Sequence, residues 1–483
     1  MSQYKTPDVY VREKSILPPS VAEVATAIPA FIGHTTKLNE AGDAANFLNM
    51  PVRITSMVEF EASFGGPYQE SFMMVPSSKG YDITNVAAVV DGNGNETSPA
   101  KLVGAMHFLH QAVTHFFANG GGACYIVSVG VAGTMAAKED YTAAIDLLNK
   151  VDEATLISSP ETIGMDEVGH YEVQNKALKH AKKRMDRFAL VDVLMNGPQD
   201  GKTEIAHDSE RLRAKVTQGL QYGASYYPYL TTTIARSYDE ANVTVKVPST
   251  DAQNVVTYKD VKLADLGDDS HADYNAQIYN AAKAALAKNY LTLPPSPAIA
   301  GVMAKTDKDR GVWKAPANVA LSQVLAPSLA IDSTEQENLN VDAVSGKSIN
   351  AIRTFVGKGT LVWGARTLAG NDNEWRYVSV RRLFNMVEES IQKATQFAVF
   401  EPNTPFTWLK LKTMIESYLE NLWRQGAFFG ESPAQAFFVN VGLGQTMTED
   451  DINNGIMNIE IGLAAVRPAE FIVLTFSHKS LEG

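Results

Sequence analysis

Three histidines lie close together in the stretch AMHFLHQAVTHFF, and histidine is the side chain best suited to binding a metal ion or moving a proton. His107 and His110 are three residues apart, which places both on one face of a helix, and His115 follows on the same helix. A metal site would need further ligands converging from elsewhere, and the sequence names none. We therefore interpret these histidines as core or subunit-interface residues and expect no metal ion.

A second short motif imitates a calcium loop. Asp91, Asn93 and Asn95 have the spacing of its first ligands. The pattern then fails, because Glu96 stands where the loop needs glycine and Leu102 stands where it needs a bidentate glutamate. We predict a surface turn.

Glycine-rich and nucleophilic motifs are equally incomplete. The glycines at 120–122 follow a helix and precede a strand, whereas a phosphate loop has the opposite order. GKGT at 357–360 lacks the P-loop pattern and is predicted to be a turn. Cys124 lies inside an apolar strand, where thiols are usually inert. No GxSxG motif is present, so we predict that the chain is not an enzyme and needs no cofactor.

Composition places the chain among ordinary globular proteins. Its 483 residues are enough for two or three domains. A net charge of −12 argues against a nucleic-acid coat, and the basic run KHAKKR at 179–184 is interpreted as a solvated helix face. A single cysteine fits a reducing compartment. No apolar run is long enough to span a bilayer and no signal peptide is evident, so we expect synthesis in the cytoplasm and no membrane insertion.

The C-terminal stretch has the clearest periodicity. Apolar residues recur at the helical period over 381–399 and 405–423, which predicts two helices. IMNIEIGLAAV, at 456–466, alternates like a strand with one wet face. FIVLTF, at 471–476, is almost wholly apolar and would need cover on both faces.

The rest of the chain divides into three kinds of sequence. Residues 8–12 resemble a short terminal strand that must pair at long range, before Pro18 and Pro19 interrupt regular structure. From 101 to 234, helices and strands alternate, which predicts a mostly parallel, helix-covered sheet. Residues 235–297 combine a small β element with an Ala-rich helix and end at PPSP.

Several longer motifs resemble one family. WGARTL (363–368), RRLF (381–384), FEPN (400–403), TMTEDDINNG (446–455) and RPAEFI (467–472) are similar to the C-terminal domain of contractile tail sheath proteins. These subunits wrap the inner tube of contractile phage tails and related injection machines. AGVMAKTDKDRGVWKAPAN, at 300–318, and residues 51–75 extend the resemblance, most closely to the sheaths of extracellular injection particles.

The resemblance implies an α/β and α+β multidomain fold, in which a conserved mixed core domain is built from N- and C-terminal parts. The expected divisions are a linking arm (1–35), connecting parts of the core or middle domain (36–100 and 298–355), an inserted α/β outer domain (101–234), a variable decoration (235–297) and a conserved C-terminal domain facing the tube (356–483).

The implied function is that of a structural subunit, which polymerises as stacked hexameric rings and contracts to drive a tube through a target envelope. The expected partners are further copies of the chain, the inner tube protein, baseplate and terminal cap proteins, and possible paralogous sheath subunits. An extracellular injection particle is favoured, assembled in the bacterial cytoplasm and then released. A contractile phage tail is the alternative, and an α/β enzyme is a remote one.

Two sets of residues are the candidate sites. The predicted linking strands between subunits are Val9, Tyr10 and Val11 near the N-terminus, and Phe471, Ile472, Val473, Leu474, Thr475 and Phe476 near the C-terminus. The candidate tube contact is the acidic helix start at Thr448, Glu449, Asp450 and Asp451.

Overall fold

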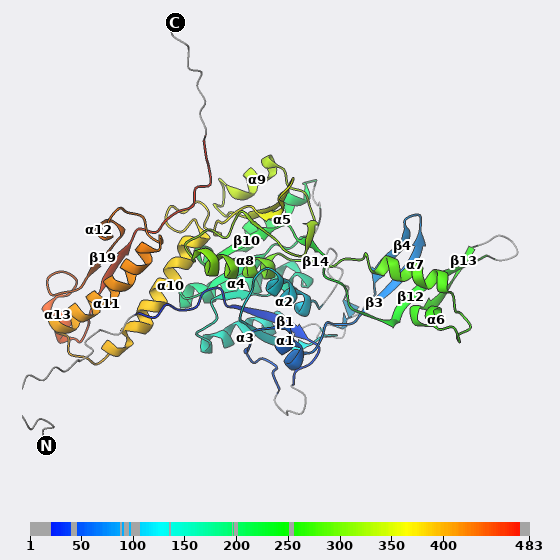
Figure 1. The fold of residues 1–483 in the computed structure, drawn as a ribbon, viewed down its shortest axis with the longest axis horizontal. Helices are drawn as coiled ribbons and strands as arrows, with labels where there is room; N and C mark the ends of the chain where they lie inside the picture. Colours follow the sequence, from blue (N-terminus) through cyan, green and yellow to red (C-terminus); the bar gives the residue numbers. More distant parts are fainter. Residues whose placement is uncertain are drawn as a thin grey trace, which may run out of the picture. The chain divides into compact units, whose positions relative to one another are not determined.

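The computed structural model describes residues 21–39, 46–86, 89–90, 96–97, 107–134, 137–195, 197, 201–250 and 256–473 (Figure 1). These residues form two compact units. The larger unit contains residues 25–386 and 467–473, and the smaller unit contains residues 21–24 and 387–466.

The larger unit is built on a mixed sheet of nine strands in the order β15-β18-β17-β10-β9-β8-β1-β7-β2. The strands from β17 to β7 are parallel, and antiparallel strands flank them at both ends. The strands are β1 (Pro29–Thr35), β2 (Val52–Ile54), β7 (Cys124–Val131), β8 (Leu156–Ser158), β9 (Phe188–Asp192), β10 (Gly223–Tyr227), β15 (Val319–Ala320), β17 (Asn350–Phe355) and β18 (Gly359–Val362).

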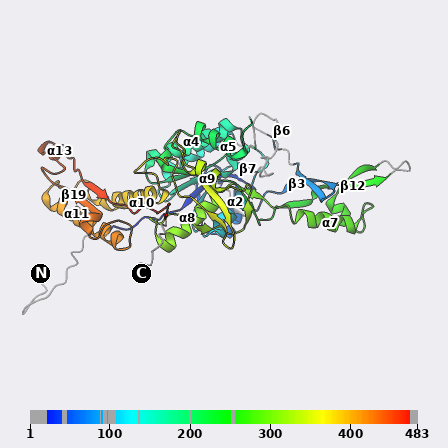
Figure 2. The same cartoon turned by 90° about the horizontal axis from the view of Figure 1, so that it is seen from above.

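Helices cover both faces of this sheet, because its parallel strands are apolar on both sides. In β9, Ala189 and Val191 belong to one buried cluster, whereas Phe188 and Leu190 belong to another. Figure 2 shows α4 and α5 on the opposite side of the sheet from α8. One cluster includes α3 (Lys138–Leu147), α4 (Glu167–Arg184) and α5 (Glu204–Lys215), and the other includes α1 (Met57–Phe64), α2 (Leu109–Ala118) and α8 (Ser296–Arg310).

A four-stranded sheet in the order β13-β12-β3-β4 has its own core. Its strands and helices are β3 (Glu70–Ser77), β4 (Gly80–Asn85), β12 (Tyr238–Thr250), β13 (Val256–Lys262), α6 (Leu263–Gly267) and α7 (Ala276–Leu286). Phe72 and Val243 are buried between them. At its base, Arg236 pairs with the buried Glu70 at 2.7 Å, and burial raises the pKa of Glu70 to about 7 despite this partner.

The smaller unit contains the helix predicted at 405–423 and a two-stranded sheet. α10 (Val378–Thr395) begins in the larger unit and ends in the smaller one. The smaller unit continues with η4 (Gln396–Ala398), α11 (Pro405–Arg424), α12 (Pro433–Ala436), β19 (Phe437–Asn440), α13 (Glu449–Asn453) and β20 (Glu460–Leu463). Trp408, Val441 and Met447 form its small buried cluster.

The remaining elements of the larger unit are short. They are β11 (Leu230–Thr232), β14 (Thr292–Leu293) and β16 (Val324–Pro327), which form one sheet, the pair β5 (Val89–Val90) and β6 (Glu96–Thr97), and η1 (Leu148–Lys150), η2 (Pro160–Gly164), η3 (Leu220–Tyr222) and α9 (Ser333–Asn340). Among the helices that the structure describes, none combines the length and apolar character of a membrane span.

The expected domain boundaries differ from this organisation in three places. β1 lies inside the nine-stranded sheet, although residues 1–35 were expected to be an arm. The strands of residues 101–234 share that sheet with β17 and β18, so they do not form a separate sheet. The decoration at 235–297 pairs with β3 through β12. Parallel pairing between distant segments explains each difference, because local periodicity does not specify which strands become neighbours.

A buried carboxyl group at the end of β9 gives a pH-dependent prediction. Asp192 is fully buried and accepts hydrogen bonds from the hydroxyl (2.5 Å) and main-chain N–H (3.2 Å) of Ser296. Burial raises the pKa of Asp192 to about 7. The folded state therefore keeps a proton that the unfolded state releases near pH 4, so stability falls as the pH rises from about 4 to about 7.

Asparagine imitates the protonated carboxyl and does not titrate. Replacing Asp192 with asparagine is therefore expected to remove up to about 4 kcal/mol from the change in the free energy of unfolding between pH 4 and pH 7. Urea unfolding of the wild-type and Asp192→Asn chains between pH 4 and 8 measures the difference. Glu70 is present in both proteins, so its contribution to the pH dependence cancels when the two proteins are compared. Equal slopes for the two proteins would contradict the prediction.

Candidate functional site

The two-stranded sheet of the smaller unit offers edges for pairing with another chain. β19 and β20 are antiparallel, with Phe437 opposite Leu463 and Asn440 opposite Glu460. Among the described residues, no further strand lies along either outer edge. Because an isolated pair of strands is only marginally stable in water, this sheet is a suitable acceptor for additional strands.

The C-terminal segment is anchored just before its apolar residues. Arg366, which is 3% exposed, donates through Nε and Nη2 to the carboxylate of Glu470 at 2.9 and 2.5 Å. Tyr377 donates to the same carboxylate at 3.3 Å. We call these three residues the tail anchor. A charge-assisted, two-pronged contact of this kind fixes the direction in which the chain leaves the larger unit.

The apolar residues that follow the tail anchor are uncovered. Phe471, Ile472 and Val473 are 72%, 78% and 85% exposed and lie outside any strand. Within the part of the chain that the structure describes, Phe471, Ile472 and Val473 therefore pair with no strand. The other predicted linking residues, Leu474, Thr475 and Phe476 and also Val9, Tyr10 and Val11, lie outside the described residues.

The candidate tube contact begins a short helix, as its sequence indicates. Thr448 caps α13: its hydroxyl accepts from the N–H of Asp451 at 3.2 Å, and its N–H donates to the Asp451 carboxylate at 2.8 Å. The N–H and the hydroxyl of Thr448 both donate to the Asp451 carboxylate, and these two hydrogen bonds lower the pKa of Asp451. Glu449 and Asp450 are exposed. The outward-facing charges of this site are therefore Glu449 and Asp450, whereas Asp451 holds the helix end together.

The three histidines that the sequence singled out have different surroundings. His110 contacts Glu61 at 2.9 Å, and His115 contacts the main-chain oxygen of Ser322 at 3.1 Å. Burial lowers the pKa of His115 to about 4. The prediction that these histidines are core residues fits His115. His107, in contrast, belongs to a cluster of side chains that the sequence did not indicate.

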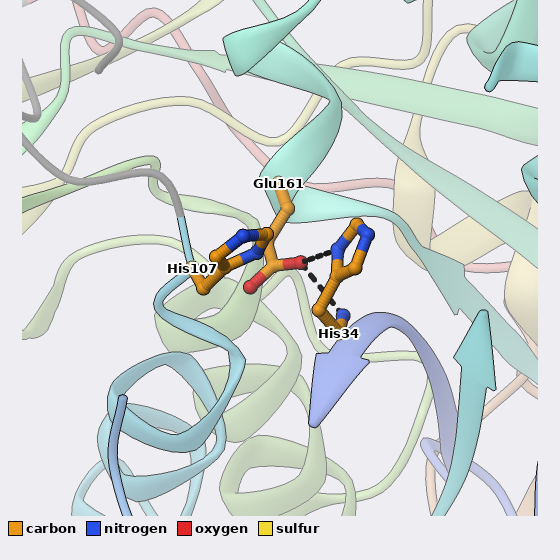
Figure 3. Close-up of side chains that lie close together, drawn as sticks. All are labelled: His34, His107 and Glu161. Atoms are coloured by element: carbon orange, nitrogen blue, oxygen red, sulfur yellow. Dashed lines mark hydrogen bonds and ion pairs between the residues drawn. The ribbon is translucent and has the colours of Figure 1, made fainter. Parts of the chain in front are cut away.

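His107 lies beside His34 and Glu161, and the three side chains form what we call the His–His–Glu cluster (Figure 3). One nitrogen or oxygen atom from each side chain lies within 4.8 Å of the other two, and all three side chains are buried. His34 is the last residue but one of β1, Glu161 lies in η2 after β8, and His107 precedes α2. The glutamate carboxylate points between the two imidazole rings.

The local backbone is shaped to bring Glu161 to β1. A Cβ atom at Gly33 would lie 2.8 Å from Oε2 of Glu161, so only glycine permits this approach. The register with β7 shifts between Gly33 and His34, a bulge of the kind that re-aims side chains. Oε2 accepts from the N–H (2.7 Å) and Nδ1 (2.8 Å) of His34, and Oε1 accepts from the N–H groups of Phe108 and Leu109.

The electrostatics of the cluster favour an ionised carboxylate and a neutral His107. Burial opposes ionisation of Glu161, but its hydrogen bonds from His34 and the charge of that ring outweigh burial and lower its pKa. Burial also lowers the pKa of His107, to about 4. At neutral pH His107 therefore offers an uncharged ring with an available lone pair.

Polar groups around an adjoining cavity lack partners. His107 and Gln111 are 4% and 3% exposed, and within the described residues neither ring nitrogen of His107 nor Oε1 of Gln111 has a hydrogen-bond partner. Both side chains, together with His34 and Tyr68, line a cavity of about 10 Å³, which is close to the space that one water molecule needs. Buried acceptors without donors are uncommon and require an explanation.

The sequence contained weak indications of this cluster. His34 lies near the end of an apolar strand in FIGHT and Glu161 follows a second one in ISSPET, but the two residues are 127 positions apart.

The other motifs that the sequence singled out have structural roles or lie outside the described residues. Cys124 is fully buried, and burial raises its pKa. The GKGT stretch forms the turn between β17 and β18. The glycines at 120–122 connect α2 to β7. Residues 91 and 93–95 lie outside the described residues.

Residues 370–479 match the phage tail sheath C-terminal domain family. The tail sheath protein of Vibrio phage KVP40 is 31% identical over 132 residues, which are 27% of this chain and 19% of that protein. The chain thus aligns with about a fifth of the length of the phage relatives that it matches.

Two solved structures are similar over almost the whole chain. The helical sheath of the anti-feeding prophage in its contracted state is 30% identical, with coverage of 99% of this chain and 100% of that chain and a TM-score of 0.63. The contracted sheath complex of PVC, an extracellular contractile injection system, is 29% identical, with 99% of each chain covered and a TM-score of 0.62.

The mixed α/β multidomain fold matches these sheath proteins over almost the whole chain, which defines a structural sheath protein. The chain belongs to the contractile tail sheath family. The predicted fold class and sheath identity are thereby confirmed. Similarity along the full length favours the injection-particle type over the phage tail.

Proposed function

We propose that the chain is the sheath subunit of an extracellular contractile injection system. Copies of it form sixfold rings that stack helically around an inner tube, and contraction of the sheath drives the tube through a target envelope. The observation that carries this proposal is the similarity, over 99% of the chain, to sheath proteins of two such particles. The subunit's role is mechanical, and no catalytic step is part of it.

In this proposal, terminal strands of neighbouring subunits complete the β19–β20 sheet. The open edges of that sheet and the exposed Phe471, Ile472 and Val473 support the proposal, because main-chain pairing provides affinity and the apolar side chains find cover only against another chain. The contact is heterologous, since donor and acceptor surfaces differ, so it propagates into a helical lattice.

The proposed partners follow from this arrangement. They are other copies of the chain, the inner tube, baseplate and terminal cap proteins, and possible paralogous subunits. Assembly takes place in the bacterial cytoplasm before the particle is released. Negative-stain microscopy of the purified chain tests the assembly function: long hollow tubes or rings support it, whereas a monomer at all concentrations contradicts it.

Removing residues 1–15 tests the N-terminal linking strand. The truncated chain is expected to fold but to form no sheath, since Val9, Tyr10 and Val11 are lost. Circular dichroism measures folding, and sedimentation with electron microscopy measures assembly. Normal sheath formation by the truncated chain would show that the linkage lies elsewhere.

We also propose that the start of α13 contacts the inner tube. Because Asp451 is needed for the helix cap, the sharper test reverses the two exposed charges, with Glu449→Lys and Asp450→Lys. The expected result is a normal sheath that no longer retains the tube in co-purification. The matched control, Glu401→Lys with Glu431→Lys, changes the charge of the same unit equally at other exposed positions. Equal tube retention by both variants would exclude this contact.

A further inference from the structure

We propose that His34, His107 and Glu161 bind one divalent transition-metal ion of the zinc class, at a structural site that is independent of sheath assembly. Two imidazole nitrogens and a carboxylate oxygen form a ligand set that zinc and neighbouring metals prefer. The three ligands come from three separate elements of the larger unit, so a bound ion would join β1, η2 and the start of α2.

The position of the cluster in the sheet supports a ligand site. β1 and β8 are adjacent and parallel; His34 lies at the carboxyl end of β1, and Glu161 follows the carboxyl end of β8. After β1 the chain passes to α1 and α2 on one face, whereas after β8 it passes to α4 on the other face. Where the connections from two adjacent strands pass to opposite faces of the sheet, a crevice opens at the carboxyl ends of those strands. Open α/β sheets bind their ligands in this crevice.

The unpartnered groups indicate what kind of ligand fits. One ring nitrogen of the neutral His107 and Oε1 of Gln111 are acceptors without a donor, and both side chains line one cavity beside an ionised carboxylate. A cation at this place satisfies the lone pair of His107 and attracts the amide oxygen of Gln111. The cavity has room for one water-sized ligand, which supplies a fourth coordination position.

Glu161 has to exchange one interaction to bind the ion. Its two oxygens accept four hydrogen bonds, of which three come from the main chain of His34, Phe108 and Leu109. The fourth comes from Nδ1 of His34 at 2.8 Å. The ion takes the place of the proton between Nδ1 and Oε2, and the neutral ring of His34 then carries its proton on Nε2, so that Nδ1 presents a lone pair to the ion. The three main-chain donors remain and hold the carboxylate in orientation.

The test uses the full-length chain, purified through a tag that contains no histidine and then stripped with EDTA. Titration with Co²⁺ is expected to give a visible absorption band that saturates at about one ion per chain, since low-symmetry nitrogen and oxygen coordination intensifies cobalt absorption. Zn²⁺ is expected to displace the cobalt and to raise the melting temperature.

Two variants locate the site. His107→Gln keeps a polar side chain of similar size and is expected to weaken Co²⁺ binding at least about tenfold. His271→Gln is the control for surface binding, because His271 is a partly exposed histidine beside Asp265 and Asp273. It should bind cobalt as the wild type does.

Two results would overturn the proposal. One is a wild-type chain that retains no cobalt after gel filtration, a measurement that stands even if the His107→Gln chain does not fold. The other is cobalt binding that is abolished by His271→Gln but unchanged by His107→Gln. In either case a water molecule, not a metal ion, would satisfy His107 and Gln111.

Discussion

A chain that ends at Glu470 is expected to fold normally and to form no sheath. Phe471, Ile472 and Val473 are largely exposed, so their removal costs the core almost nothing. Assembly, in contrast, loses the apolar residues that would be covered by the neighbouring subunit. Thermal melting measures the fold, and sedimentation with electron microscopy measures polymer formation.

Two further chains separate the possible causes of that loss. A full-length chain with Phe471→Ser and Val473→Ser keeps the length of the tail but not its apolar character, and it is expected to assemble poorly. A chain ending at Ala469 also removes Glu470 and leaves the buried Arg366 without its carboxylate. This second truncation should lower stability by roughly 1–3 kcal/mol. Efficient polymerisation of the chain ending at Glu470 would exclude the tail as a linking strand.

The second large effect is expected where α8 meets α10 inside the larger unit. Arg382 donates through Nη1 and Nη2 to the two carboxylate oxygens of Asp307 at 3.0 and 2.5 Å, and both side chains are almost completely buried. Asp307→Ala leaves a guanidinium group buried without its counter-charge. The expected loss is about 3–5 kcal/mol in the free energy of unfolding of this unit.

Replacing both partners tests whether the loss comes from the unpaired charge. The double variant Asp307→Leu with Arg382→Met removes both charges and fills a similar volume, so it should be much more stable than Asp307→Ala alone. Asp309→Ala, at an exposed position two residues away, is the matched control and should change stability by less than about 0.5 kcal/mol. Equal urea midpoints for the single and double variants would contradict the argument.

Local patterns predicted individual elements well. The helix expected at 405–423 is α11, and its apolar residues Trp408, Leu411, Ile415 and Leu419 are buried as their spacing indicates. The strand expected at 456–466 is shorter, because only Glu460–Leu463 pairs with β19. These features depend on near neighbours in the chain, which is why periodicity was sufficient.

Features that depend on distant segments were not predictable in this way. The pairing of β1 with both β7 and β8 joins residues about a hundred positions apart, and it places residues 29–35 inside the sheet. The contact of His34 with Glu161 follows from that pairing. The family resemblance supplied the sheath identity through long motifs, but it did not indicate the tail anchor or the His–His–Glu cluster.

The nine-stranded sheet has a protective consequence for a subunit that waits to be assembled. Among the described residues, its outermost strands are β15 and β2, which contain two and three residues. Edges this short give a stray chain too few main-chain groups for stable pairing. A pool of newly made subunits can therefore become concentrated without their nine-stranded sheets adhering to one another, which leaves growth to the terminal strands that we propose as links.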